Sequence, residues 1–258
     1  MKEGRKREQQ SLSPTSKNTA ISFTGGKDCN LALLHAWRDE RFNVKSLIVF
    51  RPEEAEFKAH PLRLMEEQAE CLGLPLHHVI IKRECTSYKD EYVNGMKKLK
   101  DDHGIEVIVT GDMDLVGTMA RNWIEECGEV AGIETFLPLW KADREDLLRT
   151  LVKEDFEIIF SCVKSPWFDA SWIGRQIDDE CIDEMKVIVE SSEKAAANDK
   201  GLQWKPLDLG GERGEYHTMC IFSPLYNKKV QRTVHSELEL TEQNGQKNNQ
   251  RWWVIKVD

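Results

Sequence analysis

The sequence predicts an α/β protein: a parallel five-stranded sheet with helices on both faces, followed by a smaller mixed α/β domain. Two observations lead to this fold class. Between residue 19 and about residue 140, short apolar runs alternate with segments whose apolar residues recur at helical spacing. Beyond Trp140 this alternation loosens, and strand-like runs are separated by Asn, Gly and Pro. We therefore expect a first domain over residues 18–140 and a second over residues 141–258.

The elements of the first domain follow one another in a regular order. A buried strand over residues 20–23 leads to a helix whose apolar face holds Cys29, Ala32, Leu33, Ala36 and Trp37. A helix beginning at Pro61 ends near Gly73, because proline suits a first turn and glycine suits a C-terminal cap. The other expected strands cover residues 44–50, 76–81, 106–110 and about 133–137, and the other helices cover residues 88–99 and 119–127.

The second domain is expected to mix helices with strands. Amphipathic patterns predict helices over residues 143–155 and 177–192, with a strand over residues 156–163 between them. Further strand-like pieces cover residues 218–222, 230–234 and 252–257. At the other end of the chain, residues 1–17 are rich in Ser, Gln and Lys and have no apolar period, so we expect a disordered basic tail there.

Composition excludes several classes of protein. Hydrophobic residues make up 40% of the 258 residues, and the formal net charge of −9 argues against a protein held to nucleic acid by phosphate contacts. No apolar stretch approaches the roughly 20 residues that cross a bilayer. The seven cysteines are scattered without a CxxC pair, so neither a disulfide framework nor a zinc finger is expected. We expect a cytoplasmic protein that binds neither membrane nor, stably, nucleic acid.

The sharpest motif is the run Phe-Thr-Gly-Gly-Lys-Asp-Cys over residues 23–29, between the first strand and the first helix. Two adjacent glycines allow a tight turn whose N–H groups approach an anion, and the helix N-terminus adds a partial positive charge. Since Lys27 supplies a full charge, the run predicts a polyphosphate site. Its spacing matches neither a Walker A loop nor a dinucleotide fingerprint. A plain strand-to-helix turn is the alternative.

Two further segments are candidates for the same site. Gly111 and Asp112 end the fourth strand, and ligands of parallel sheets gather beyond the carboxyl ends of the strands. Residues 210–218 combine three glycines with two carboxylates. We interpret this segment as a loop that closes over an acceptor site, where His217 or a glutamate takes a proton. A turn whose charges are solvated is the alternative.

The glycine run resembles the SGGKDS signature of the PP-loop, or N-type ATP pyrophosphatase, superfamily. Within that superfamily, other segments are similar to the diphthine–ammonia ligase family, namely residues 56–61, 110–112, 121–125, 138–140, 169–175 and 211–218. The resemblance extends from about residue 21 to about residue 229. It implies a Rossmann-like (HUP-type), ATP-binding PP-loop domain over residues 18–140 and a C-terminal substrate domain over residues 141–258.

The resemblance also implies a reaction. ATP adenylates the carboxylate of diphthine, a modified histidine of elongation factor 2, and ammonia then displaces AMP to form the amide. ATP, with Mg²⁺, is the implied cofactor, ammonium and diphthine-bearing elongation factor 2 are the implied partners, and we consider a homodimer as the assembly. A carboxylate needs this activation because oxide is a poor leaving group and AMP is a far better one.

We assign site roles as follows. The ATP-binding candidates are Thr24, Gly25, Gly26, Lys27, Asp28, Cys29, Gly111 and Asp112, and either Asp28 or Asp112 is a candidate ligand of Mg²⁺. The catalytic candidates are Lys27, Asp28, Glu212, Glu215 and His217. The substrate-binding candidates are Arg121, Asn122, Trp172, Arg175 and Glu212. His60 is a further residue that can line the site.

Three questions stay open at this point. Cys29 replaces the final serine of the signature, and a reactive-thiol role for it would need a lowered pKa. Lys27→Ala is expected to abolish turnover and leave the fold intact, because we expect Lys27 to face phosphate and not the core. Two other functions remain: another N-type ATP pyrophosphatase that amidates a small-molecule carboxylate or modifies tRNA, and a catalytically weak ATP-binding module.

Overall fold

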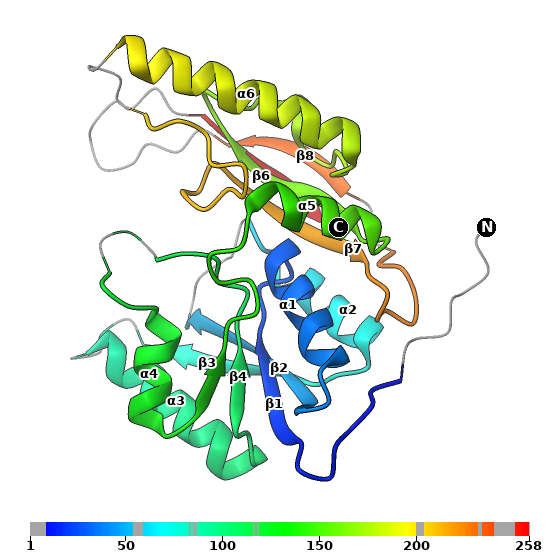
Figure 1. Cartoon of the computed structure of the whole chain (residues 1–258), viewed down its shortest axis with the longest axis vertical. Helices are drawn as coiled ribbons and strands as arrows, with labels where there is room; N and C mark the ends of the chain where they lie inside the picture. Colours follow the sequence, from blue (N-terminus) through cyan, green and yellow to red (C-terminus); the bar gives the residue numbers. More distant parts are fainter. Residues whose placement is uncertain are drawn as a thin grey trace.

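Two β-sheets organise the chain, and the computed structural model shows them on either side of the helices α1 and α2 (Figure 1). The described residues are 9–53, 59–82, 84, 87–115, 117, 119–199, 204–231, 234–239 and 251–257. Of the predicted disordered tail, residues 9–17 lie in this part of the chain. Residue 17 already belongs to the first strand, and residues 10 and 13 bond to the first residue of the second strand and to the turn before it. Ser13 N donates to Glu40 O at 3.2 Å, and Gln10 Nε2 donates to Phe42 O at 2.9 Å.

The first sheet has the strand order β3-β2-β1-β4-β5. Its strands are β1 (Lys17–Ser22), β2 (Phe42–Pro52), β3 (Leu76–Ile81), β4 (Val107–Val109) and β5 (Glu134–Phe136), and every neighbouring pair is parallel. Ile21 in the central strand is level with Leu47 on one side and with Val109 on the other. The predicted α/β fold class, with a five-stranded parallel sheet in the first half of the chain, is confirmed.

Helices cover both faces of this sheet, as the alternation of apolar residues requires. The helices are α1 (Lys27–Arg38) and α2 (Leu62–Leu72) on one face, and α3 (Tyr88–His103) and α4 (Trp123–Ala131) on the other. Ile21 and Leu47 belong to the apolar cluster of α1 and α2. Their chain neighbours Ala20 and Ile48 belong to the cluster of α3 and α4, because successive side chains of a strand point to opposite faces.

The second sheet is antiparallel, with the order β7-β6-β9-β8. Its strands are β6 (Glu157–Lys164), β7 (Tyr216–Phe222), β8 (Val234–Glu239) and β9 (Trp252–Val257), and its helices are α5 (Arg144–Lys153), the 3₁₀ turn η1 (Ala170–Trp172) and α6 (Asp179–Asn198). α6 lies along the outer side of this sheet (Figure 1). Among the helices of the described chain, none is both long enough and apolar enough to cross a membrane.

α1 is buried nearly all round because it lies between the two sheets (Figure 1). A helix that is apolar on every side is typical of such an interior position. Polar bonds fix the second sheet to this helical layer: Tyr226 OH donates to Asn30 Oδ1 at 3.0 Å, and Gln68 Nε2 of α2 donates to Cys220 O at 2.7 Å. The N-terminus of α1 is therefore placed where the carboxyl edge of the first sheet meets β7.

Two predicted elements differ in the structure. The helix expected over residues 119–127 begins at Trp123, because Asn122 is its N-cap: Asn122 Oδ1 accepts hydrogen bonds from Ile124 N and Glu125 N. The strand expected over residues 230–234 differs at its start: residues 230 and 231 are not in a strand, and residues 232–233 lie outside the described residues. Val230 N instead donates to Ile221 O at 3.0 Å after a turn, and β8 begins only at Val234.

Candidate functional site

The glycine run follows β1 and forms the N-terminus of α1. Gly25 has a φ of +76°, and a Cβ there would lie 2.3 Å from Gln68 Oε1. Gly26 is the N-cap of α1. Because it has no side chain, it cannot accept a hydrogen bond from the first N–H groups of the helix. Such N–H groups, with the helix dipole behind them, suit an anion such as phosphate.

The fourth strand reaches this loop through Gly111. A Cβ at Gly111 would lie 2.5 Å from the carbonyl carbon of Asp28 and 2.7 Å from Cys29 N, so no larger residue fits. Asp112, the next residue, accepts a hydrogen bond from Asn122 Nδ2 at 2.6 Å. The segments that follow β1 and β4 are therefore in contact. The hydrogen bond from Asn122 joins the segment after β4 to the start of α4.

Lys27 is buried, with 4% of its surface exposed. Its Nζ donates to Gly210 O at 2.6 Å and to Asp28 Oδ2 at 2.8 Å, and lies 5.4 Å from the centre of the Tyr216 ring. Its backbone N–H donates to Thr218 Oγ1 at 3.0 Å. The expectation that Lys27 points away from the interior is therefore wrong, because its ammonium is buried and joins α1 to the loop before β7. That this ammonium binds phosphate stays a prediction.

That loop, residues 208–215, is held in shape by Glu215. Glu215 is 1% exposed, and its two carboxylate oxygens accept the backbone N–H groups of Asp208 and Arg213, each at 2.9 Å. Tyr216 OH adds a bond to Leu209 O at 2.7 Å. Because both oxygens of Glu215 are occupied by its own loop, this residue orders the loop, and it is poorly placed as the base that the sequence suggests.

Glu212 lies at the exposed side of the same loop. The residue is exposed to solvent as a whole, but burial of the inner side of its carboxyl raises the pKa of that carboxyl to about 7. The nearby carboxylates of Asp28 and Asp208 act in the same direction, whereas the cations of Lys27 and Arg144 oppose them. A carboxylate that titrates near neutral pH beside a phosphate-binding loop is suited to general base chemistry.

A histidine pair closes another side of the glycine run. His60 Nε2 and His217 Nδ1 are 3.3 Å apart, and His60 Cε1 lies 3.7 Å from the position of a Cβ on Gly26. Burial, then His217, then Lys27 lower the pKa of His60 to about 3, and burial followed by Lys27 lowers the pKa of His217. Both imidazoles are therefore neutral near pH 7, where they can donate or accept hydrogen bonds.

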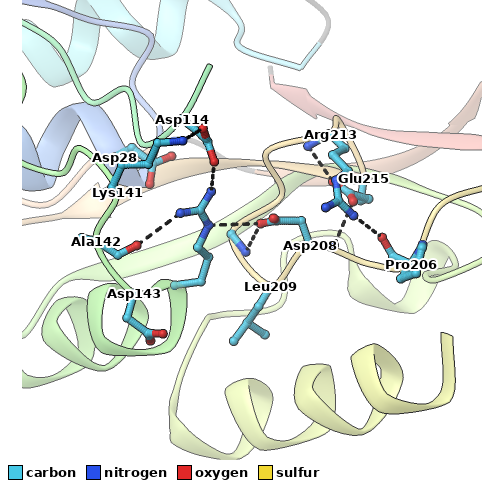
Figure 2. A network of polar contacts seen from close by, with 12 residues as sticks. Asp28, Asp114, Lys141, Ala142, Asp143, Pro206, Asp208, Leu209, Arg213 and Glu215 are labelled. Atoms are coloured by element: carbon cyan, nitrogen blue, oxygen red, sulfur yellow. Dashed lines mark hydrogen bonds and ion pairs between the residues drawn. The ribbon is translucent and has the colours of Figure 1, made fainter. Parts of the chain in front are cut away.

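Arg144, which the sequence did not indicate, connects the loops around the site; its partners Asp114, Ala142 and Asp208 are labelled in Figure 2. Its Nη2 lies 3.3 Å from Asp114 Oδ2, and its Nε lies 3.7 Å from Asp208 Oδ1. Lys141 also pairs with Asp114. The fork geometry of arginine suits such bridging between two carboxylates. A cation at the first position of α5, four residues after Trp140, is the signal that marks it in the sequence.

Three predicted substrate-binding residues are occupied elsewhere. Arg121 makes a bidentate pair with Glu129, with contacts of 2.5 and 3.0 Å, on the surface of α4. Arg175 pairs in the same way with Glu184 of α6, at 2.6 and 2.7 Å. Trp172 is buried against Phe160 and Phe168, with ring centres 5.4 and 4.8 Å away. These partners account for all three side chains, so the structure does not bring them to the glycine run.

Cys29 is buried, and burial raises the pKa of its thiol to about 11. Its Sγ donates to Gly26 O at 3.3 Å, and Thr24 Oγ1 lies 3.9 Å from it. A reactive cysteine needs a lowered pKa and exposure. The reactive-thiol reading of Cys29 is therefore unsupported, and the residue stabilises the turn in the way that a serine hydroxyl would.

The two candidate carboxylates are suited to hold Mg²⁺ only together with a phosphate ligand. Asp28 Oδ2 accepts from Lys27, and Asp112 Oδ2 accepts from Asn122, which leaves one oxygen of each without a side-chain donor among the described residues. In the described part of the chain, no three side chains of His, Cys, Asp or Glu form a metal-binding group. Mg²⁺ commonly binds through one or two carboxylates plus substrate phosphates, so the residues fit that mode.

A surface depression of the described chain lies apart from the glycine run. It has a volume of about 600 Å³ and lies between α5, α6 and the segment from Lys205 to Arg213. Its lining includes Arg144 and Asp208 but none of residues 23–29. The chemistry of the glycine run, and not the depth of the surface, therefore identifies the candidate site.

A parallel sheet whose first strand leads through a Gly-Gly-Lys turn into a helix N-terminus defines a nucleotide-binding α/β protein. The family models of the diphthamide synthase N-terminal domain and C-terminal domain match residues 17–135 and 143–254. The chain belongs to the diphthamide synthase family, and it is an ATP-dependent ligase.

Individual relatives agree with this assignment. The chain is 22% identical over 232 residues to a diphthine–ammonia ligase of Mus musculus, which covers 82% of this chain and 81% of the relative. It is 23% identical over 225 residues to that of Schizosaccharomyces pombe, covering 81% of this chain but 35% of the longer relative. A solved structure described as a predicted subunit of tRNA methyltransferase from Methanocaldococcus jannaschii has a TM-score of 0.40 and 16% identity, over 79% of this chain and 96% of the other.

Proposed function

We propose that this ligase amidates the carboxylate of diphthine on elongation factor 2, using ATP and ammonia. Family membership supports the reaction type, and the mouse and yeast relatives carry the name diphthine–ammonia ligase. The observation that carries the proposal is the contact between the glycine run and the loop before β7, made by Lys27 Nζ and Gly210 O at 2.6 Å. This contact brings a phosphate-type site and the general base candidate Glu212 together.

In the first step, a carboxylate oxygen of the substrate attacks the α-phosphorus of ATP, and pyrophosphate leaves. Two anions must approach each other, so cationic and N–H donors have to offset their repulsion. We assign this role to the N–H groups at the start of α1 and to the ammonium of Lys27. Asp28 and Asp112 would hold Mg²⁺, which neutralises charge on the phosphates when it is bound.

In the second step, ammonia attacks the activated acyl carbon, and AMP leaves with the former carboxylate oxygen. Ammonium carries no lone pair, so it must lose a proton before it attacks. We assign Glu212 as the base, because its carboxyl titrates near pH 7 and one side of it is accessible. Glu215 is occupied by backbone N–H groups, and His217 is engaged with His60, so both are less suited to the role.

One reaction tests the proposal. The protein is incubated with ATP, Mg²⁺, ammonium and elongation factor 2 that carries diphthine, and AMP, pyrophosphate and the amidated peptide are measured. Formation of AMP together with the amide supports the proposal. Formation of ADP and phosphate refutes it. If AMP forms only with a small carboxylic acid or with tRNA, the substrate is another one, and ATP binding without turnover on any substrate leaves a binding module.

A further inference from the structure

Figure 2 shows a chain of polar contacts that joins the carboxyl edge of the first sheet to the loop before β7. Arg144 bridges Asp114 and Asp208 at 3.3 and 3.7 Å. Asp208 Oδ1 in turn accepts the N–H of Gly210 at 2.8 Å, and Gly210 O accepts from Lys27 Nζ at 2.6 Å. Arg144 is therefore three contacts away from Lys27, with Asp208 and Gly210 in between.

Arg144 is itself fixed by the fold. It is the first residue of α5, whose N-cap Asp143 accepts the N–H of Asp146 at 3.0 Å. Its Nη1 donates to Ala142 O at 3.2 Å, and its side chain is 21% exposed. The buried side chain of Leu148 anchors α5 in the main apolar cluster. A guanidinium held on a helix that is packed in this way can position a loop more accurately than a loop residue can.

We propose that Arg144 is a positioning residue of the ligase site: by bridging Asp114 and Asp208, it holds the turn that carries Gly210 and Glu212 against Lys27. Without the guanidinium, Asp208 loses its cation, Asp114 keeps only Lys141, and the turn loses an attachment to α5 while Glu215 still holds its shape. The effect of Arg144 on the reaction with ammonia rests on the proposed function, in which Glu212 is the base. Its effect on the position of Glu212 does not depend on that function.

The charges that face Glu212 give this proposal a signature. They are Lys27 and Asp28 from α1, Arg144 from α5 and Asp208 from the turn. Removal of a neighbouring cation raises the pKa of a carboxyl, and removal of a neighbouring anion lowers it. Arg144→Ala and Asp208→Asn should therefore shift the pKa of Glu212 in opposite directions, although both weaken the same bridge. A loss of stability alone would not produce opposite shifts.

The test compares Arg144→Ala, Arg144→Lys and Asp208→Asn with the control Arg149→Ala. Arg149 is on the same helix but pairs with Asp179 and Asp183 on the α6 side. The pKa of the Glu212 carboxyl is measured by ¹³C NMR without nucleotide or substrate, and its signal is assigned by its loss in Glu212→Gln. Next, kcat/KM for ammonia is measured at one fixed pH by varying the ammonium concentration, with diphthine-bearing elongation factor 2 held constant.

We expect Arg144→Ala to raise the Glu212 pKa above about 7 and to lower kcat/KM for ammonia about 10- to 100-fold. Arg144→Lys should restore the pKa but only part of the activity, because an ammonium cannot bridge two carboxylates as a fork does. Asp208→Asn should lower the Glu212 pKa and also reduce activity, since its amide oxygen keeps the Gly210 bond but loses the charge. Arg149→Ala should change neither quantity more than about twofold.

The outcomes separate this inference from the proposed function. An unchanged Glu212 pKa and an ammonia kcat/KM within about twofold of wild type in folded Arg144→Ala would overturn the positioning role. If Arg144→Ala does not fold, the direction of the Asp208→Asn shift decides, and an upward shift or none overturns the proposal. If wild-type protein forms no AMP with this substrate while the pKa shifts occur as expected, the proposed function fails and the positioning role stands.

Discussion

Lys27 is the residue whose replacement tests the architecture of the site most directly. Lys27→Ala removes a charge-assisted bond and leaves Gly210 O without its buried donor, which costs about 1–3 kcal/mol. It also removes three buried methylene groups, at about 0.8 kcal/mol each. Relief of the cost of burying a cation offsets part of this loss. We expect a net destabilisation of about 2–4 kcal/mol, which lowers Tm by about 5–15 °C for a chain of this size.

The measurement is urea unfolding of wild type, Lys27→Ala, Lys27→Met and a surface control, Lys17→Ala, together with AMP formation. Lys27→Met keeps the buried stem and should lose only the bond, so it should be more stable than Lys27→Ala and equally inactive. Lys17 pairs with Glu134 on the surface, where such pairs contribute about 0–1 kcal/mol. Equal stability of Lys27→Ala and Lys17→Ala would refute the contact with Gly210, and AMP formation by Lys27→Met would show that the ammonium is dispensable.

Three shorter predictions concern neighbouring residues. Glu212→Gln should remove the rise in activity that levels off above about pH 7 at constant ammonium, because the wild-type base is charged, and can take the proton of ammonium, only above its raised pKa; the same rise and plateau in the variant would exclude Glu212. Cys29→Ser should keep or raise AMP formation, since the buried thiol is protonated at neutral pH, and complete loss would argue for thiol chemistry. Gly111→Ala should lower stability by about 2 kcal/mol or more and abolish turnover, because its Cβ meets the backbone of Asp28; Gly117→Asn, in open space at a φ of +59°, is the control.

The parts of the site that depend on neighbouring residues in the chain were predictable. A strand, two glycines, a lysine and a helix start lie within one short run, so residues 23–29 indicated the loop directly. Gly111 was also placed correctly beside this loop, because parallel strands bring their carboxyl ends to one edge. The helix start at Trp123 was missed, although Asn122 is a good N-cap residue, because the apolar run before it suggested an earlier turn.

The parts that depend on distant partners were not predictable. The acceptor of the Lys27 ammonium, Gly210, is 183 residues away, and nothing in the run around Lys27 indicates that it is buried. That Arg121 and Arg175 would form ion pairs away from the glycine run was unpredictable for a related reason. Their carboxylate partners lie eight and nine residues further on, beyond the three- or four-residue spacing at which a helix reveals an ion pair in its sequence. A cation in a matched segment therefore did not distinguish a ligand contact from a surface pair.

The position of α1 between the two sheets explains why the site needs both halves of the chain. A strand-to-helix turn alone offers N–H groups to an anion, but here β7 also supplies Thr218 Oγ1 to Lys27 N, and Cys220 N donates to Gly25 O at 2.9 Å. The shape of the turn is thus set from the second sheet. Since the loop that leads into β7 also carries Glu212, any movement of β7 relative to α1 would change the phosphate-type site and the position of the base together.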